Sequence, residues 1–311
     1  MSRHRRKTAA PLTVAGLVRE GERKFRAARL HFGHGTFNAR DEAAYLTLHA
    51  LGLPLDASAR LRRHTVSPDE ARRVRELFSR RIRSRKPSPY LTNEAWLGNF
   101  RFYVDERAIT PRSHIAGLLN DQLSPWIATP GSVRTALDLC TGSGCLAILL
   151  AHSFPQARID AVDASAAALA VARINVRNYR LSKRIRLVKS DTFSALVGKR
   201  YDLIVCNPPY VTAAAMQRLP REYRHEPRMA LAGGSDGLGL VRTILKRIPG
   251  HLAPGGLLVM EVGDGGRRVE RAFPGIEFTW AETPGGGDVL VVHREQLQGP
   301  ALPARAKRAT A

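Results

Sequence analysis

The residues Asn207-Pro208-Pro209-Tyr210 are the part of the chain whose types and spacing point most directly to chemistry. They follow an apolar run, 201–206, that is typical of a buried strand. Because proline lacks an N–H donor and has a fixed φ, the strand must end there. An Asn carboxamide beside free backbone carbonyls can accept both hydrogens of an –NH2 group, and a Tyr ring can pack on a planar one. The motif therefore predicts chemistry on a planar NH2 group at the carboxyl end of a strand, where open α/β sheets bind ligands.

A second group of residues forms a glycine-rich loop between an expected strand and an expected helix, with the sequence Asp138-Leu139-Cys140-Thr141-Gly142-Ser143-Gly144-Cys145. Asp163 ends the next strand, about 20 residues on, where an acidic side chain can bind a ribose diol. The loop has one glycine too few for a dinucleotide fingerprint, and Asp138 would repel a pyrophosphate but suits a sulfonium cation. We therefore expect S-adenosylmethionine rather than NAD(P). The structural alternative is that Asp138 forms a buried turn and that Asp163 caps a helix.

Ser190-Asp191 stands at the end of the third expected strand. A carboxylate at this place can accept a hydrogen bond from an adenine amino group, whereas the structural alternative is an ordinary helix cap. The two preceding motifs favour adenine binding by Asp191.

The 311 residues carry a net charge of +22, which attracts polyanions such as nucleic acid or a ribonucleoprotein. A genome that favours arginine and alanine codons would produce the same excess, and both interpretations stay open. The three cysteines, Cys140, Cys145 and Cys206, suit a reducing cytosol rather than a disulfide framework, and their spacing argues against a metal site. No secretory signal or membrane span is apparent, so we expect a cytoplasmic protein without bound metal.

Apolar periodicity divides the chain into five parts. We expect a basic disordered tail at 1–10, a helical substrate-recognition domain at 11–86, a hairpin and linker helix at 87–130, a catalytic domain at 131–297 and a second basic tail at 298–311. In the catalytic domain, strands are predicted at 134–139, 157–163, 184–189, 201–206, 256–262, 276–281 and 288–293, and helices at 144–153, 165–179, 237–252 and 265–273. This alternation predicts an α/β fold with a mostly parallel seven-stranded sheet, and a closing hairpin that makes one edge strand antiparallel.

The motifs together resemble a class I S-adenosylmethionine-dependent methyltransferase of the amino-methylating branch. Tyr223-Arg224-His225-Glu226-Pro227, Ala230-Leu231 and Gly234-x-Asp236-Gly237-Leu238 after the Asn-Pro-Pro-Tyr motif are similar to the protein-glutamine N5-methyltransferases. Three N-terminal strings resemble the subgroup that modifies large-subunit ribosomal protein L-three: Phe32-Gly33-His34-Gly35-Thr36-x-Asn38, Tyr90-Leu91-Thr92-Asn93-Glu94-Ala95-Trp96, and Phe102-Tyr103-Val104-Asp105-Glu106-Arg107 with Pro111-Arg112-Ser113. The resemblance spans residues 12–297.

The resemblance implies a Rossmann-like catalytic sheet, a small helical domain, and methylation of a glutamine side-chain amide. It implies cofactor binding by Asp138, Cys140, Gly142, Gly144, Asp163, Asp191 and Asn207, catalysis by Asn207, Pro208 and Tyr210, and substrate binding by Asn207 to Tyr210 and Arg112. The partner would be the ribosomal protein, with rRNA if it is modified in an assembling particle. Three places depart from the family pattern: Gly117, Gly263-Asp264-Gly265, and Gly285-Gly286-Gly287-Asp288.

Three rival functions remain open from the residues. The same Asn-Pro-Pro-Tyr motif could act on a flipped adenine at N6 in RNA or DNA, which the basic charge favours. A release-factor glutamine is a second candidate substrate, although the N-terminal strings speak against it. A non-catalytic ribosome-assembly or RNA-binding protein that retains the fold is a third, and the intact Asp138, Asp163 and Asn207 argue against it.

Overall fold

The computed structural model describes residues 12–55, 64–283 and 286–297. The chain forms two compact units: the first runs to Glu94 and includes Pro220–His225, and the second comprises Ala95–Leu219 and the residues from Glu226 onward. The predicted tails at 1–10 and 298–311 lie outside the described residues. In the described part of the chain, no helix combines the length and the apolar character that crossing a membrane requires.

The first unit is helical and consists of α1 (Val14–Ala27), α2 (Ala39–Leu51), α4 (Pro68–Ser84), α5 (Ser88–Thr92) and the 3₁₀ helix η2 (Arg221–His225). Ser67 and Glu70 cap α4 reciprocally, as the Ser-Pro-Asp-Glu sequence predicts. Helix α2 begins at Ala39, because the Asn38 side chain accepts hydrogen bonds from the backbone N–H groups of Arg40 and Asp41. It ends at Gly52, whose φ of 64° is a conformation that glycine adopts without strain.

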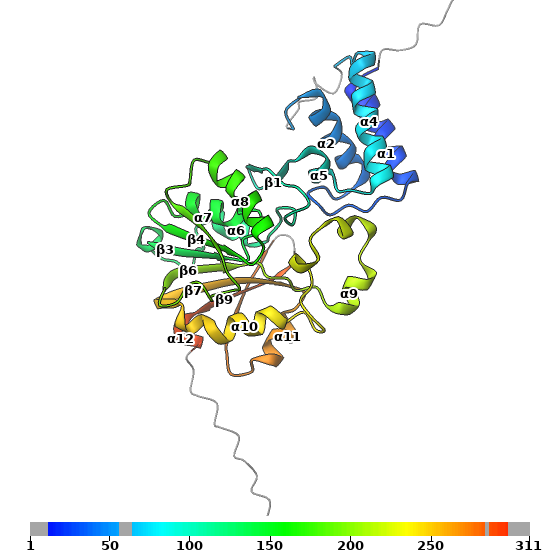
Figure 1. The fold of residues 1–311 in the computed structure, drawn as a ribbon. Helices are drawn as coiled ribbons and strands as arrows, with labels where there is room; N and C mark the ends of the chain where they lie inside the picture. The colour runs from blue at the N-terminus through cyan, green and yellow to red at the C-terminus, as the bar shows by residue number, and fades with distance from the viewer. Residues whose placement is uncertain (1–11, 56–63, 284–285, 298–311) are drawn as a thin grey trace, which may run out of the picture. The chain divides into compact units, whose positions relative to one another are not determined.

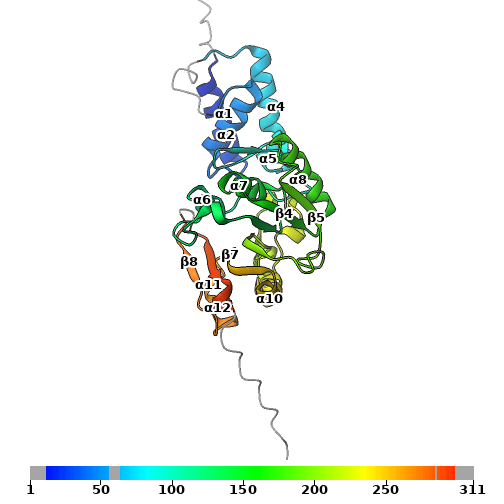
Figure 2. The same ribbon diagram turned by 90° about the vertical axis from the view of Figure 1, so that its left-hand side faces the viewer.

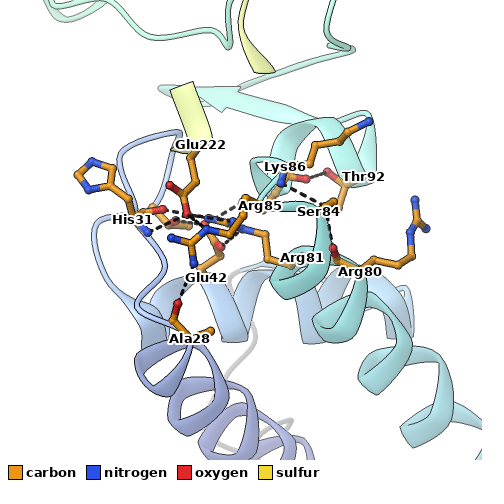
Figure 3. A network of polar contacts seen from close by, with 12 residues as sticks. Ala28, His31, Glu42, Arg80, Arg81, Ser84, Arg85, Lys86, Thr92 and Glu222 are labelled. Carbon is orange, nitrogen blue, oxygen red and sulfur yellow. Dashed lines mark hydrogen bonds and ion pairs between the residues drawn. The ribbon is translucent and has the colours of Figure 1, made fainter. Parts of the chain in front are cut away.

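A buried ion network joins the C-terminal end of α4 to α2 and to η2 (Figure 3). Arg81 Nε donates to Glu42 Oε1 at 2.6 Å, and Arg85 Nε lies 3.1 Å from Glu222 Oε1. Arg81, Glu42 and Glu222 are all at most 1% exposed. The arginines of α4 and of the residue after it predict a shared outer face, either solvated or in contact with RNA or an acidic partner: Arg72, Arg73, Arg75, Arg80, Arg81, Arg83 and Arg85. That prediction is wrong for Arg81, because the chain returns as 220–225 and brings Glu222 to pair with it.

The second unit contains a small antiparallel hairpin and a seven-stranded sheet. The hairpin joins β1 (Ala95–Leu97) to β2 (Phe100–Phe102), and α6 (Ile115–Asn120) follows it. The hairpin and α6 lie within the stretch 87–130, where a hairpin and a linker helix are predicted. The sheet strands are β3 (Thr135–Leu139), β4 (Arg158–Asp163), β5 (Ile185–Lys189), β6 (Tyr201–Cys206), β7 (Leu252–Gly263), β8 (Thr279–Ala281) and β9 (Asp288–His293). The helices between them are α7 (Cys145–Ser153), α8 (Ala166–Asn178), α9 (Ala213–Arg218), α10 (Gly239–Arg247) and α11 (Gly266–Ala272), and α12 (Arg294–Leu297) follows β9.

The strand order of the sheet is β5-β4-β3-β6-β7-β9-β8. The first five strands are parallel, and β9 runs antiparallel to both of its neighbours, so the predicted α/β fold is confirmed. Helices α6, α7 and α8 cover one face and α10 and α11 cover the other (Figures 1 and 2). Each face of the sheet has its own hydrophobic core, and successive residues of β3 belong to different ones. Ala136 packs with α7, and Leu137 packs with α10. Because the strand order reverses between β3 and β6, their carboxyl ends border the crevice in which such sheets bind ligands.

Candidate active site

The glycine-rich loop and the Asn-Pro-Pro-Tyr motif leave the sheet side by side. Leu139 at the end of β3 is in register with Cys206 at the end of β6. The residues that follow, Cys140 and Asn207, therefore begin the two motifs at the same edge of the sheet. Asp163 ends β4 in register with Lys189 of β5, and exposed Asp191 follows just beyond. The structure thus places all four predicted motifs of the second unit along one edge of the sheet.

The turn after β3 uses backbone conformations that glycine favours. Gly142 and Gly144 have φ values of 54° and 81°, and half-buried Cys140 also has a positive φ of 65°. A Cβ atom on Gly144 would lie 3.1 Å from the Cβ atom of Ala172 in α8. Asn175 of α8 holds the same loop by donating to the Ser143 carbonyl at 2.8 Å. The loop is therefore fixed against α8 and leaves little room for a side chain at its last glycine.

Asp138 lies beneath this loop and is fully buried. Its Oδ2 atom accepts hydrogen bonds from the Thr141 hydroxyl at 2.5 Å and from the Ala147 backbone N–H at 2.9 Å. Its Oδ1 atom has no partner among the residues that the structure describes. Burial raises the pKa of Asp138 to about 7, because the charged form loses its hydration. When Asp138 is ionised, its unpaired oxygen places negative charge beneath the loop.

Asp163 closes the loop from the neighbouring strand. Its Oδ2 atom accepts from the Gly142 backbone N–H at 2.9 Å, and its Oδ1 atom accepts from the Ser165 backbone N–H at 2.8 Å. The cap of α8 is Ser165 itself, whose side chain accepts from Ala168 N–H. Burial raises the pKa of Asp163. Since each carboxylate oxygen has a second lone pair, Asp163 retains acceptor capacity for a diol.

The Asn207 carboxamide has a defined orientation. Its Nδ2 atom donates to the backbone carbonyl of Arg112 at 3.2 Å. Its Oδ1 atom has no hydrogen-bond partner within the described ranges, and it remains an acceptor for an incoming N–H. Pro208 is buried and Pro209 is half-buried. The hydrogen bond to Arg112 thus determines which end of the amide is presented to a ligand.

Tyr210 packs against two glycines and is bound by one carboxylate. A Cβ atom on Gly263 would lie 2.6 Å from ring atom Cε2 of Tyr210, and one on Gly233 would lie 2.7 Å from its Cα atom. The Tyr210 hydroxyl donates to Glu261 Oε1 at 3.0 Å. Gly263 and Gly233 therefore let other backbone segments approach the tyrosine closely, and the ring has little freedom to turn.

Two buried glutamates of this site were not predicted from the sequence. Glu226, which is 4% exposed, pairs with the Arg112 guanidinium at 2.6 and 2.7 Å. Glu261, which is 3% exposed, accepts from the Ser113 hydroxyl at 2.7 Å. Glu261 is the only acid in the apolar run 256–263, and an acid within an otherwise apolar strand could have identified it as a candidate site residue. The Arg112 side chain is engaged by Glu226, so its predicted direct contact with substrate stays a prediction.

The three departures from the family pattern differ in how near they lie to this arrangement, and Gly263 packs directly against the Tyr210 ring. Gly117 is exposed on α6, and a Cβ atom there would meet no atom within 4 Å. Gly265 precedes α11, and Gly266 N–H donates to Asp288 Oδ2 at 2.8 Å. Part of the Gly-Gly-Gly-Asp turn, 284–285, lies outside the described residues.

Comparisons with known proteins agree with this geometry. The family described as "Methyltransferase small domain" matches residues 121–225. A ribosomal protein uL3 glutamine methyltransferase of Bordetella pertussis is 50% identical over 286 residues, covering 92% of this chain and 96% of its own. One of Neisseria meningitidis serogroup B is 51% identical over 288 residues, covering 92% and 95%. The chain belongs to the ribosomal protein uL3 glutamine methyltransferase family. The predicted family resemblance is therefore confirmed.

A solved structure of a methyltransferase from Pyrococcus furiosus is 17% identical to this chain, with a TM-score of 0.47. It covers 72% of this chain and 98% of its own. An identity this low does not indicate a substrate. The family assignment rests on the sequence relatives alone.

Proposed function

We propose that this chain transfers a methyl group from S-adenosylmethionine to the side-chain amide nitrogen of a glutamine in ribosomal protein uL3. The observation that supports it most directly is the Asn207 carboxamide, whose nitrogen is bound to the Arg112 carbonyl and whose oxygen is left as an acceptor. Membership of the uL3 glutamine methyltransferase family supports the same substrate. We place the reaction in the cytoplasm, where ribosomal proteins are made.

The loop after β3 suits the proposed cofactor. The unpaired Asp138 Oδ1 atom provides negative charge beneath a loop that positive φ values bring close to its ligand. Asp138 is fully buried, so it would act through its charge and through the loop that it holds, rather than by direct contact. Cys140, Gly142 and Gly144 would line the methionine end, Asp163 would bind the ribose, and Asp191 would bind the adenine. When bound, S-adenosylmethionine supplies a methyl group on a positively charged sulfur.

The side chains at the end of β6 would orient the substrate amide. An amide nitrogen is a poor nucleophile because its lone pair is delocalised into the carbonyl. We propose that Asn207 Oδ1 and the Pro208 carbonyl accept its two hydrogens, so that the lone pair points toward the donor site. Tyr210 packs on the amide plane, and Pro209 narrows the space beside it. Such positioning can lower the activation barrier by about 7–11 kcal/mol. As the N–C bond forms, the sulfur would keep the electron pair of the broken S–C bond. The N–H proton becomes acidic only as the N–C bond forms and would then leave to solvent, so no strong base is required beforehand.

Replacement of Asn207 tests this assignment. Purified enzyme, S-adenosylmethionine and uL3 should give a mass increase of one methyl group on a glutamine-containing peptide. Asn207→Ala should lower turnover at least about 100-fold, because the acceptor for the substrate N–H is lost, while cofactor binding by calorimetry persists. Near-normal turnover of Asn207→Ala would contradict the role of this residue. A release-factor protein and an adenine-containing RNA serve as competing substrates, and methylation of either in preference to uL3 would overturn the proposed substrate.

We also propose that rRNA takes part in substrate recognition. A chain with a net charge of +22 repels a free basic protein, and RNA bound to that protein would relieve the repulsion. The same assay on free uL3 and on uL3 in ribosomal particles, at low and high salt, addresses this. Particle-bound uL3 should be the better substrate at low salt, with an advantage that salt reduces. An equal salt response of the two substrates would rule rRNA out.

A further inference from the structure

Two buried glutamates enclose the short segment that precedes α6. Glu226 Oε1 accepts from the backbone N–H and the hydroxyl of Thr110, at 3.1 and 2.9 Å, and both of its oxygens bind the Arg112 guanidinium. Glu261 Oε2 accepts from the Ser113 hydroxyl at 2.7 Å and the His114 backbone N–H at 2.9 Å. The residues on both sides of the Arg112 carbonyl are therefore fixed, by two carboxylates from different parts of the chain.

The same glutamates connect this segment to the Asn-Pro-Pro-Tyr motif. The Arg112 carbonyl, between the two anchored ends, accepts from Asn207 Nδ2. Glu261 Oε1 accepts from the Tyr210 hydroxyl. Two carboxylates therefore hold the groups that would bind the substrate amide: Glu226 and Glu261 fix the segment that binds Asn207, and Glu261 binds Tyr210. In the proposed mechanism, neither carboxylate touches the methyl donor or the substrate.

We propose that Glu226 and Glu261 are positioning residues for methyl transfer, acting through the Arg112 carbonyl on Asn207 and through the hydroxyl of Tyr210. This inference rests on the proposed function. If the Arg112 carbonyl moves, the Asn207 amide can rotate and present its NH2 group to the substrate. The substrate amide NH2 is also a hydrogen-bond donor, so the two groups could not form a hydrogen bond. Because an error of about 1 Å in a reacting geometry can cost on the order of 100-fold in rate, the effect falls on turnover rather than on cofactor affinity.

The first experiment compares Glu226→Gln and Glu261→Gln with a matched control, Asp160→Asn. Asp160 is also a buried carboxylate bound by an arginine, a lysine and a tyrosine hydroxyl, but its tyrosine, Tyr201, begins β6 at the opposite edge of the sheet. The kcat per folded enzyme on uL3 should fall at least about tenfold in both glutamate variants. It should stay within about twofold of wild type in Asp160→Asn. The affinity for S-adenosylmethionine should be unchanged in all three.

The second experiment separates positioning from a general loss of structure. In Glu261→Gln the NH2 group can still donate to the Tyr210 hydroxyl, so Glu261→Met is used here to remove that hydrogen bond, and Tyr210→Phe removes it from the other side. If Glu261 acts through that hydroxyl, the double variant should be no slower than the slower single variant. Multiplicative losses would overturn that part of the proposal.

A wild-type kcat in both Glu226→Gln and Glu261→Gln would overturn the whole inference, and so would an equal loss in Asp160→Asn. If Glu226→Gln does not fold, Arg112→Lys replaces it, because lysine keeps the charge but loses the paired hydrogen bonds to Glu226. Its kcat should fall at least about tenfold, and a wild-type kcat would count against the inference. Failure of the proposed function would appear separately, as wild-type enzyme that does not methylate uL3 at all.

Discussion

The buried carboxylate Asp138 should make the cofactor-free enzyme less stable at alkaline pH than an uncharged variant. The raised pKa, from 3.8 to about 7, means that the folded chain binds this proton more tightly than the unfolded chain does. The stabilising effect of protonated Asp138 is therefore complete below the unfolded pKa near 3.8. It is lost progressively as the pH rises through about 7.

Asp138→Asn is the perturbation that isolates this effect. Its carbonyl oxygen can still accept from Thr141 and Ala147, and its NH2 group replaces the unpaired Oδ1 atom. At 1.36 kcal/mol for each unit of pKa difference, the advantage of the variant in free energy of unfolding should be about 1 kcal/mol at pH 4.5 and about 4 kcal/mol at pH 8. Any other difference between Asp and Asn cancels when the two pH values are compared.

Urea unfolding followed by tryptophan fluorescence measures this difference. All three tryptophans, Trp96, Trp126 and Trp280, belong to the second unit, which also contains Asp138, so the signal reports on the relevant unit. Saturating S-adenosylmethionine should stabilise the wild type but not the variant, since the variant lacks the charge that favours a cation. A stability difference that is the same at pH 4.5 and pH 8 would refute the argument.

Two further predictions follow from close packing and from buried charge. Gly263→Ala should lower kcat at least about tenfold without changing cofactor affinity by calorimetry, because the new Cβ atom would lie 2.6 Å from the Tyr210 ring; unchanged turnover would show that the ring position does not matter. Arg81→Met should lower the free energy of unfolding of the helical unit by about 3–5 kcal/mol, because Glu42 would be left buried without its arginine and Glu222 would keep only Arg85. Hydrogen exchange of α2 and α4 measures it, and exposed Arg72→Met, expected to change stability by less than about 0.5 kcal/mol, is the control.

The sequence predicted the sheet well, because its strands are short apolar runs bounded by glycine, proline or acidic residues. All seven strands and the closing hairpin appear, with ends that differ most at β7 and β8. The four motifs at the carboxyl edge were predictable for the same reason. A motif at the end of a parallel strand has its place in space determined by the strand.

Contacts between segments far apart in the chain were not predictable from local pattern. The pairing of Arg81 with Glu222 spans more than a hundred residues, and so does the pairing of Arg112 with Glu226. Periodicity placed Arg81 on the polar face of its helix, since an arginine is normally solvated. Only the tertiary fold shows that a distant carboxylate reaches it and makes its burial possible.

The return of residues 220–225 to the helical unit bears on how the chain folds as it is synthesised. Domains generally fold as units, N-terminal first, as the chain emerges. Here α1, α2 and α4 leave the ribosome long before Glu222, and until then Arg81 lacks one of its two carboxylates. The helical unit can reach its final form only after β6 has also been translated. Its last folding step therefore waits for residues that follow β6 in the chain, and nascent chains that end before residue 222 should present a helical unit that is open to proteases and chaperones.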